Sequence, residues 1–213
     1  MAPAKSDART FWIIAGPNGY GKSPLYGSNR DAVYGNTVIS DSTRPFWIIN
    51  PDLLASRIRS AERLSSRTAN VEAVERIEAW LKASIHAHQS IGVETVLSTG
   101  KYRRLVRAAK NKGFEIRLVY VILQSPTLNV ERVKLRVKKG GHGVPIKKIL
   151  DRRARSLQQL SWFLREADWA LLFDNSRELR VIGQKENGTV ILDPDAPAAV
   201  REAVEKLRAA GNK

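Results

Sequence analysis

The segment at positions 10–23 reads TFWIIAGPNGYGKS, and it decides the fold. Its first six residues, Thr10–Ala15, form a nearly unbroken apolar run, which predicts a buried β-strand. The next eight match the pattern Gly-x-x-x-x-Gly-Lys-Ser, with the fixed positions at Gly16, Gly21, Lys22 and Ser23. An apolar strand that leads directly into this pattern is the expected context of a P-loop, which holds phosphate groups.

The residue types of this loop suit phosphate binding. Glycines let backbone N–H groups turn toward phosphate oxygens, and the helix expected after the loop presents its positive end to them. The Lys22 ammonium would reach the β- and γ-phosphates of a nucleotide, and the Ser23 hydroxyl would hold Mg²⁺. Asn18 and Gly19 complete the part of the loop that we expect to bind the nucleotide. The alternative is a glycine-rich turn that only caps a helix, although chance matches to the full pattern are rare.

Two residues depart from the small side chains that such a loop comfortably carries. Tyr20 places a bulky ring inside the loop, where it could stack on a bound nucleotide or shade it. Pro24 lies in the first expected helical turn, where its missing N–H is tolerated. Either change would weaken nucleotide binding without removing Lys22 or Ser23.

Composition favours anionic partners. The chain has 213 residues, with 36 lysines and arginines against 21 aspartates and glutamates, for a formal net charge of +15. The length favours one domain, and a hydrophobic content of 43% is enough for a sizeable core. The charge is typical of proteins that bind phosphates, nucleotides, nucleic acid or an acidic protein, but a solvated basic surface explains charge alone equally well.

Missing residue types narrow the chemistry. The sequence contains no cysteine, which excludes disulfides, thiolate metal sites and a cysteine nucleophile. His86 and His88, two of the three histidines, would lie on different faces of a helix, so a zinc site is not expected. No apolar run approaches the roughly 18 residues that cross a bilayer, and the N-terminus lacks an apolar leader. We therefore expect a cytoplasmic protein without a membrane partner.

Strand and helix patterns alternate along the rest of the chain. Strands are expected at 46–49, 93–97, 114–123 and 169–173. Helices are expected after Pro51, at 71 to about 90 with Asn70 as the cap and Val71 and Val74 on the apolar face, at 101–111, at 127–139 and at 146 to about 165. This alternation predicts a parallel sheet covered on both faces.

The C-terminal part follows a different pattern. Asn187-Gly188 between two β-rich runs predicts a β-hairpin, and a closing helix ends at Gly211. We expect residues 1–9 to be disordered, residues 24–45 to be mainly loop, and residues 10–213 to form one α/β domain of three layers, α/β/α, with the hairpin and closing helix at 178–210.

Three carboxylates are placed where a parallel sheet exposes its functional edge. Asp52 follows the second strand and could accept a proton from a substrate hydroxyl, help to hold Mg²⁺, or cap the helix near Pro51. Glu94 lies within the third strand, where a carboxylate is costly unless it is paired or used. Asp174 follows an apolar run, which is typical of a Mg²⁺-holding strand, but it could equally cap the turn at Asn175.

A basic segment predicts a mobile lid. Residues 130–155 contain ten lysines and arginines against Glu131 and Asp151, and GGHGVP interrupts them. The glycines can act as a hinge and Pro145 can restart the helix, so a basic helical hairpin could bring arginines onto a transferring phosphoryl group. The alternative is a solvated pair of basic helices.

The order of these motifs resembles that of zeta-toxin-like kinases. The shared segments, from about residue 10 to 176, are GPNGYGKS, INPD (49–52), ETVLS (94–98), FEIRLVYVIL, RVKLRVKKGGHGVP (132–145), RRARSL (152–157) and FDNS (173–176). The resemblance implies a nucleotide-kinase-like P-loop NTPase fold with a helical lid. It also implies Mg²⁺-dependent transfer of the ATP γ-phosphate to a hydroxyl, which in characterised zeta toxins is the sugar 3′-hydroxyl of UDP-N-acetylglucosamine.

The resemblance also implies roles for individual residues. Lys22 and Ser23 would hold phosphate and Mg²⁺, and Asp52 would be the base. Glu94 and Ser98 fall in the segment that would face the acceptor. The catalytic lid arginines would be Arg136 together with Arg152 or Arg155. An acidic antitoxin protein is the implied protein partner.

Two other function classes stay open from the sequence. The net charge also suits a nucleic-acid-directed P-loop kinase or binder, although no basic stretch is interleaved with aromatic residues. The unusual Tyr20 and Pro24 also suit a degenerate, non-catalytic nucleotide-binding module that an antitoxin holds.

Overall fold

The computed structural model describes residues 9–22, 25, 33–34, 37–38, 47–138 and 143–211. The expected disordered N-terminus, apart from Arg9, and most of the expected loop at 24–45 lie outside this part of the chain. Ser23 and Pro24 also lie outside it. Of the helix expected after the P-loop, only a turn at Leu25 is described. Within the loop segment the structure adds a short antiparallel pair that the sequence does not signal, β2 (Val33–Tyr34) and β3 (Thr37–Val38).

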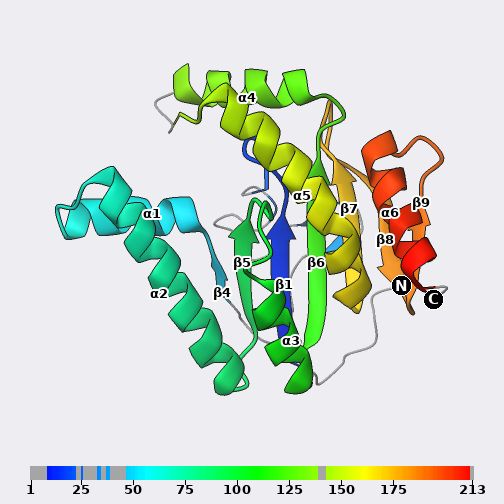
Figure 1. The fold of residues 1–213 in the computed structure, drawn as a ribbon, viewed down its shortest axis with the longest axis horizontal. Helices are drawn as coiled ribbons and strands as arrows, with labels where there is room; N and C mark the ends of the chain where they lie inside the picture. Colours follow the sequence, from blue (N-terminus) through cyan, green and yellow to red (C-terminus); the bar gives the residue numbers. More distant parts are fainter. Residues whose placement is uncertain are drawn as a thin grey trace.

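A seven-stranded, mostly parallel sheet organises the molecule (Figure 1). In spatial order its strands are β4 (Trp47–Ile49), β5 (Ile91–Thr95), β1 (Thr10–Ala15), β6 (Glu115–Ile122), β7 (Trp169–Asp174), β8 (Arg180–Glu186) and β9 (Thr189–Leu192). The first five are parallel, and β8 and β9 run antiparallel. The predicted mostly parallel α/β fold is confirmed.

The described helices are α1 (Pro51–Ala61), α2 (Ser66–His86), α3 (Arg103–Asn111), α4 (Pro126–Lys138), α5 (Ile146–Glu166) and α6 (Ala198–Gly211). Figure 1 shows α3, α5 and α6 on one face of the sheet, while α1 and α4 lie beyond the carboxyl ends of the parallel strands. None of the described helices combines the length and the apolar character that a membrane span requires.

The apolar runs become the centre of the core. All six residues of β1 are buried between β5 and β6, which explains why this strand is apolar on both faces. The Trp12 ring meets the Trp169 ring edge-on at 5.7 Å between centroids. The predicted hairpin is also confirmed, with Asn187 (φ 51°) and Gly188 (φ 78°) in the left-handed conformation that its two-residue turn requires.

The predicted start of α2 is wrong. The helix begins at Ser66, capped by the Ser65 hydroxyl, which accepts from the Thr68 N–H at 3.1 Å. Asn70 therefore lies inside the helix, and its Nδ2 donates to the Ser66 carbonyl at 2.6 Å.

The predicted apolar face of α2 is wrong in its N-terminal half. Val71 and Val74 are exposed, while the small residues Ala69 and Ala73 are buried in a cluster with Ile58 of α1. Close approach of two helices requires small side chains, which a search for large apolar residues overlooks.

Candidate active site

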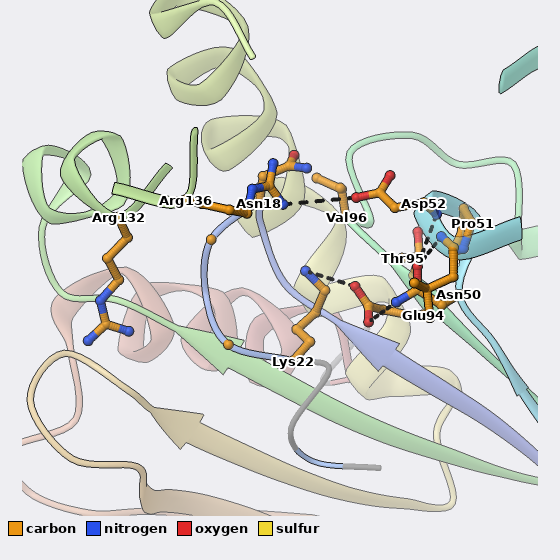
Figure 2. Close-up of a pocket in the computed structure, with 13 residues that line it drawn as sticks. Asn18, Lys22, Asn50, Pro51, Asp52, Glu94, Thr95, Val96, Arg132 and Arg136 are labelled. Atoms are coloured by element: carbon orange, nitrogen blue, oxygen red, sulfur yellow. Dashed lines mark hydrogen bonds and ion pairs between the residues drawn. The ribbon is translucent and has the colours of Figure 1, made fainter. Parts of the chain in front are cut away.

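The carboxyl ends of the parallel strands surround a cleft of about 420 Å³ (Figure 2). Its walls are the loop after β1, the first turn of α1, the end of β5 and two arginines of α4. Because strands β1, β4 and β5 run in the same direction, segments far apart in the sequence end at one edge of the sheet. The cleft contains Lys22, Asp52, Glu94 and Arg136, four of the residues that the sequence singled out.

The loop after β1 has the backbone that its glycines predict. Gly16 (φ 137°) and Gly21 (φ 76°) both lie in the region that favours glycine. A side chain would not fit at either position, since a Cβ at Gly16 would overlap the Val121 carbonyl oxygen and one at Gly21 would overlap the Asn175 amide. The loop therefore passes close to the ends of β6 and β7.

Lys22 is buried at the bottom of the cleft, next to a carboxylate. Its Nζ donates to the Pro17 carbonyl at 3.0 Å and lies 3.7 Å from Glu94 Oε1. Burial lowers the pKa of Lys22, and the adjacent Glu94 charge opposes that shift. Figure 2 shows the ammonium directed at Glu94, which Asn50 contacts from the other side at 3.0 Å. A buried ammonium of this kind is an electrostatic site for a phosphate group.

Asp52 lies across the cleft, and its carboxylate is not the helix cap. The cap of α1 is Asn50, whose Oδ1 accepts from the backbone N–H groups of Asp52 (3.0 Å) and Leu53 (3.2 Å). The Asp52 side chain remains 72% exposed and lies 4.0 Å from Arg136 Nη1. Its carboxylate is thus available to a molecule that enters the cleft.

Of the three predicted lid arginines, two reach the loop after β1 and one does not. Arg136 extends across the loop toward Asp52 (Figure 2), and Arg152 Nη1 donates to Asn18 Oδ1 at 3.2 Å. Arg155 is exposed on α5 and does not line the cleft. Ser98 does not line it either, because Thr95 and Val96 of the same segment form that wall.

Arg132 is a cleft residue that sequence reasoning missed. It lies one turn before Arg136 on α4, lines the cleft and donates from Nη2 to the Ser176 carbonyl at 3.3 Å. The signal was available, because arginines four residues apart on a helix lie on the same face.

The expectation that Tyr20 contacts the nucleotide is wrong. The Tyr20 side chain is fully buried beneath the loop, and its hydroxyl is hydrogen-bonded to Arg153 of α5. Burial raises the pKa of Tyr20 to about 12, so the phenol is neutral at physiological pH. The sequence does not signal this placement, because Arg153 is a distant residue in the lid segment.

Asp174 is the cap of a turn. It is buried, and its Oδ1 accepts from the Ser176 N–H at 2.9 Å, while Oδ2 accepts from Gln124 Nε2 at 3.1 Å. The next residue, Asn175, donates from Nδ2 to the Tyr20 carbonyl at 3.0 Å and so holds the loop. Asn129 of α4 does the same at the Asn18 carbonyl. Of the two roles left open for Asp174, the structure supports the structural one.

The described residues have limited means to bind a metal ion by themselves. Within that part of the chain, no group of three or more histidine, aspartate or glutamate side chains is arranged to hold a metal ion. The carboxylates that line the cleft are Asp52 and Glu94. This donor set suits Mg²⁺, which is usually bound through one or two carboxylates together with waters and substrate phosphates.

Comparisons with known proteins indicate the family of the chain. The family model described as zeta toxin matches residues 3–195. An uncharacterised protein of Haemophilus influenzae is 31% identical over 141 residues, covering 63% of this chain and 90% of that protein.

Two solved structures share the fold. One is AvrRxo1-ORF1:-ORF2 with ATP, with a TM-score of 0.66 and 16% identity over 94% of this chain. This chain covers 63% of that one, which is longer. The other is from the PezAT chromosomal toxin-antitoxin system of Streptococcus pneumoniae, with a TM-score of 0.56 and 15% identity over 98% of this chain and 88% of that chain. The P-loop, its lysine and the facing carboxylates line one cleft. Because the zeta toxin model also matches most of the sequence, the chain belongs to the zeta toxin family and is a P-loop kinase.

Proposed function

We propose that this kinase transfers the γ-phosphoryl group of ATP to a hydroxyl of a UDP-activated sugar such as UDP-N-acetylglucosamine. The observation that carries the proposal is the arrangement of buried Lys22 beside Glu94, with the exposed Asp52 carboxylate in the same cleft. A cation for phosphate and a carboxylate for a hydroxyl proton are the two groups that phosphoryl transfer to an alcohol needs.

Each residue then has a defined task. Lys22 binds the terminal phosphates, and Asp52 accepts the proton of the attacking hydroxyl. Arg136 and Arg152 approach the loop from the lid and would offset the negative charge that develops on the transferred group. Mg²⁺ would neutralise the phosphate charge, held by the phosphates and the Ser23 hydroxyl.

A second cleft supports an acceptor larger than a simple sugar. It has a volume of about 530 Å³, lies between α1 and α2, and shares Asp52, Leu53 and Arg136 with the first. Its wall includes the basic side chain of Arg59 and the amide of Asn70. A hydroxyl at Asp52 would leave the rest of the acceptor in this polar, basic space, which suits a sugar that carries a diphosphate.

The experiment is a coupled assay with Mg²⁺, ATP and UDP-N-acetylglucosamine that follows ADP and phosphorylated sugar. We expect Lys22→Ala to abolish turnover, because the loop loses its only described ammonium. Asp52→Asn should lower kcat by about 10²–10⁴ with an unchanged melting temperature, since Asn50 still caps α1. Lys206→Ala, at an exposed position of α6, is the matched control.

The possible outcomes distinguish the assignment of the phosphate site from the assignment of the acceptor. Turnover that survives Lys22→Ala would contradict the assignment of the phosphate site. Turnover with another hydroxyl compound in place of the UDP-sugar would contradict only the proposed identity of the acceptor.

An acidic antitoxin is the proposed protein partner. The net charge of +15 favours an acidic protein, and a fold neighbour comes from a toxin-antitoxin system. Co-expression with the neighbouring open reading frame, followed by affinity purification, should recover a stable acidic partner. If the chain were purified alone under those conditions, the proposal of an acidic antitoxin partner would be contradicted.

A further inference from the structure

A buried pair joins the P-loop to helix α5. Tyr20 is 0% exposed and Arg153 is 7% exposed, and a guanidinium N–H of Arg153 donates to the Tyr20 hydroxyl oxygen. The Arg153 Cζ also lies 5.9 Å from the centre of the Tyr20 ring. A guanidinium can only donate hydrogen bonds, so the phenol oxygen is the acceptor.

Arg153 also binds the end of the central strand. Its Nη1 donates to the Leu123 carbonyl at 2.7 Å and its Nη2 donates to the Gln124 carbonyl at 3.1 Å. These carbonyls follow β6, the strand beside β1. One buried guanidinium thus connects three elements: the loop, the end of β6 and α5. A buried charge with several good hydrogen bonds resists displacement, because any movement leaves it without partners.

The same helical turn carries a residue that faces the loop from outside. Arg152, adjacent to Arg153, donates to Asn18 Oδ1 at 3.2 Å. Consecutive residues on a helix point about 100° apart, so fixing Arg153 in the core fixes the direction in which Arg152 leaves α5. One turn further on, the buried Ser156 hydroxyl meets the Tyr120 hydroxyl at 3.0 Å. Helix α5 is therefore held to the core from Arg153 onward.

We infer that Tyr20 and Arg153 are positioning residues for phosphoryl transfer. Tyr20 fixes the peptide segment before Gly21 and Lys22 from beneath, and Arg153 fixes the turn of α5 that presents Arg152 to the loop. The bulky residue in the loop thus serves to hold the phosphate site in shape.

The test compares two tyrosines that contact the same helix. Tyr20→Phe and Tyr120→Phe each delete one buried hydroxyl that meets α5, but only Tyr20 belongs to the P-loop. Isothermal titration calorimetry measures the Kd of the full chain for Mg-ATP, and thermal unfolding measures stability. We expect both variants to melt at a lower temperature. The Kd of Tyr20→Phe should rise about tenfold or more, whereas Tyr120→Phe should stay within about twofold of the wild type.

A second variant addresses Arg153 directly. Arg153→Lys keeps the charge but loses the planar fork that reaches several acceptors, so its Kd should rise to a similar degree. The double variant Tyr20→Phe/Arg153→Lys should bind ATP no more weakly than the weaker single variant, because both changes break one interaction.

Two results would overturn the inference alone: a Kd for Tyr20→Phe that rises less than about fivefold relative to Tyr120→Phe, or additive effects in the double variant. A wild-type chain that binds no Mg-ATP would overturn the inference together with the proposed function.

Discussion

The Lys22 ammonium and the Glu94 carboxylate set the electrostatics of the cleft at the scale of single residues. Lys22 is buried, which destabilises its charged form, and Glu94 at 3.7 Å supports that charge. Asn50 Nδ2 in turn holds the Glu94 carboxylate. A phosphate that enters the cleft would supply further negative charge, so ATP binding and protonation of Lys22 are linked.

Glu94→Gln should make ATP binding more sensitive to pH. Burial lowers the pKa of Lys22 in the free enzyme, so ATP affinity should fall as pH rises through that pKa, because neutral lysine attracts phosphate poorly. Without the Glu94 charge the pKa falls further and the loss begins at a lower pH. In a calorimetric pH series, the Kd for Mg-ATP should begin to rise at a lower pH in Glu94→Gln than in the wild type. Glu62→Gln, in an exposed ion pair with Arg76, is the control. If the Kd for Mg-ATP changed with pH in the same way in Glu94→Gln and in the wild type, this linkage would be contradicted.

At the scale of elements, the α1–α2 hairpin forms most of the wall of the second cleft, where we propose that the acceptor binds. Small buried residues bring the two helices together, and the hairpin places Arg59 and Asn70 in the wall of the second cleft. Two acidic groups of this hairpin are used outside the cleft, since Glu62 and Glu72 both bind Arg76. Within the described residues Arg59 forms no ion pair, and its Nη1 lies 3.4 Å from Ser66 Oγ.

Arg59→Gln should therefore raise the KM for UDP-N-acetylglucosamine about tenfold and leave the KM for ATP unchanged, because the lost charge would face the acceptor diphosphate. Initial rates with the sugar varied at saturating ATP, and with ATP varied at saturating sugar, measure the two KM values. The matched control is Arg57→Gln, which removes an exposed arginine of the same helix that does not line the cleft. Equal KM values for the two variants would place the acceptor elsewhere.

At the scale of the whole molecule, the C-terminal hairpin and α5 are joined by a buried lysine. Lys185 of β8 donates from Nζ to the carbonyls of Leu164 (2.7 Å), Arg165 (3.1 Å) and Ala167 (2.6 Å). These carbonyls end α5 and have no partner within the helix. Burial lowers the pKa of Lys185, but the three acceptors compensate for the desolvated charge.

Lys185→Met should lower the free energy of unfolding by about 1–3 kcal/mol, because the three carbonyls at the end of α5 lose their lysine donor. Urea unfolding measures the change, and calorimetry should find the ATP Kd unaltered, since β8 lies away from the cleft. Lys206→Met, which breaks only an exposed ion pair on α6, should change stability by less than about 0.5 kcal/mol. A loss of ATP affinity in Lys185→Met would show instead that the hairpin influences the phosphate site.

The sequence by itself determined the features that depend on neighbouring residues. A short apolar run followed by glycines specifies β1 and its loop, and Asn187-Gly188 specifies the hairpin, because the apolar character of a strand and the backbone conformation of a turn depend on neighbouring residues. The order of the motifs was sufficient to identify the family. Lys22 was identified from the P-loop pattern, Asp52 because it follows a strand of a parallel sheet, and Glu94 because a carboxylate within an apolar strand needs a partner or a use.

Only the tertiary structure decided how side chains distant in sequence are paired. Tyr20 and Arg153 are 133 positions apart, so nothing near Tyr20 indicates that its ring points into the core. The start of α2 depended on competition between two polar caps, and its buried face depended on the shape of α1. Such choices follow from packing and hydrogen-bond satisfaction across the whole fold, which local patterns do not record.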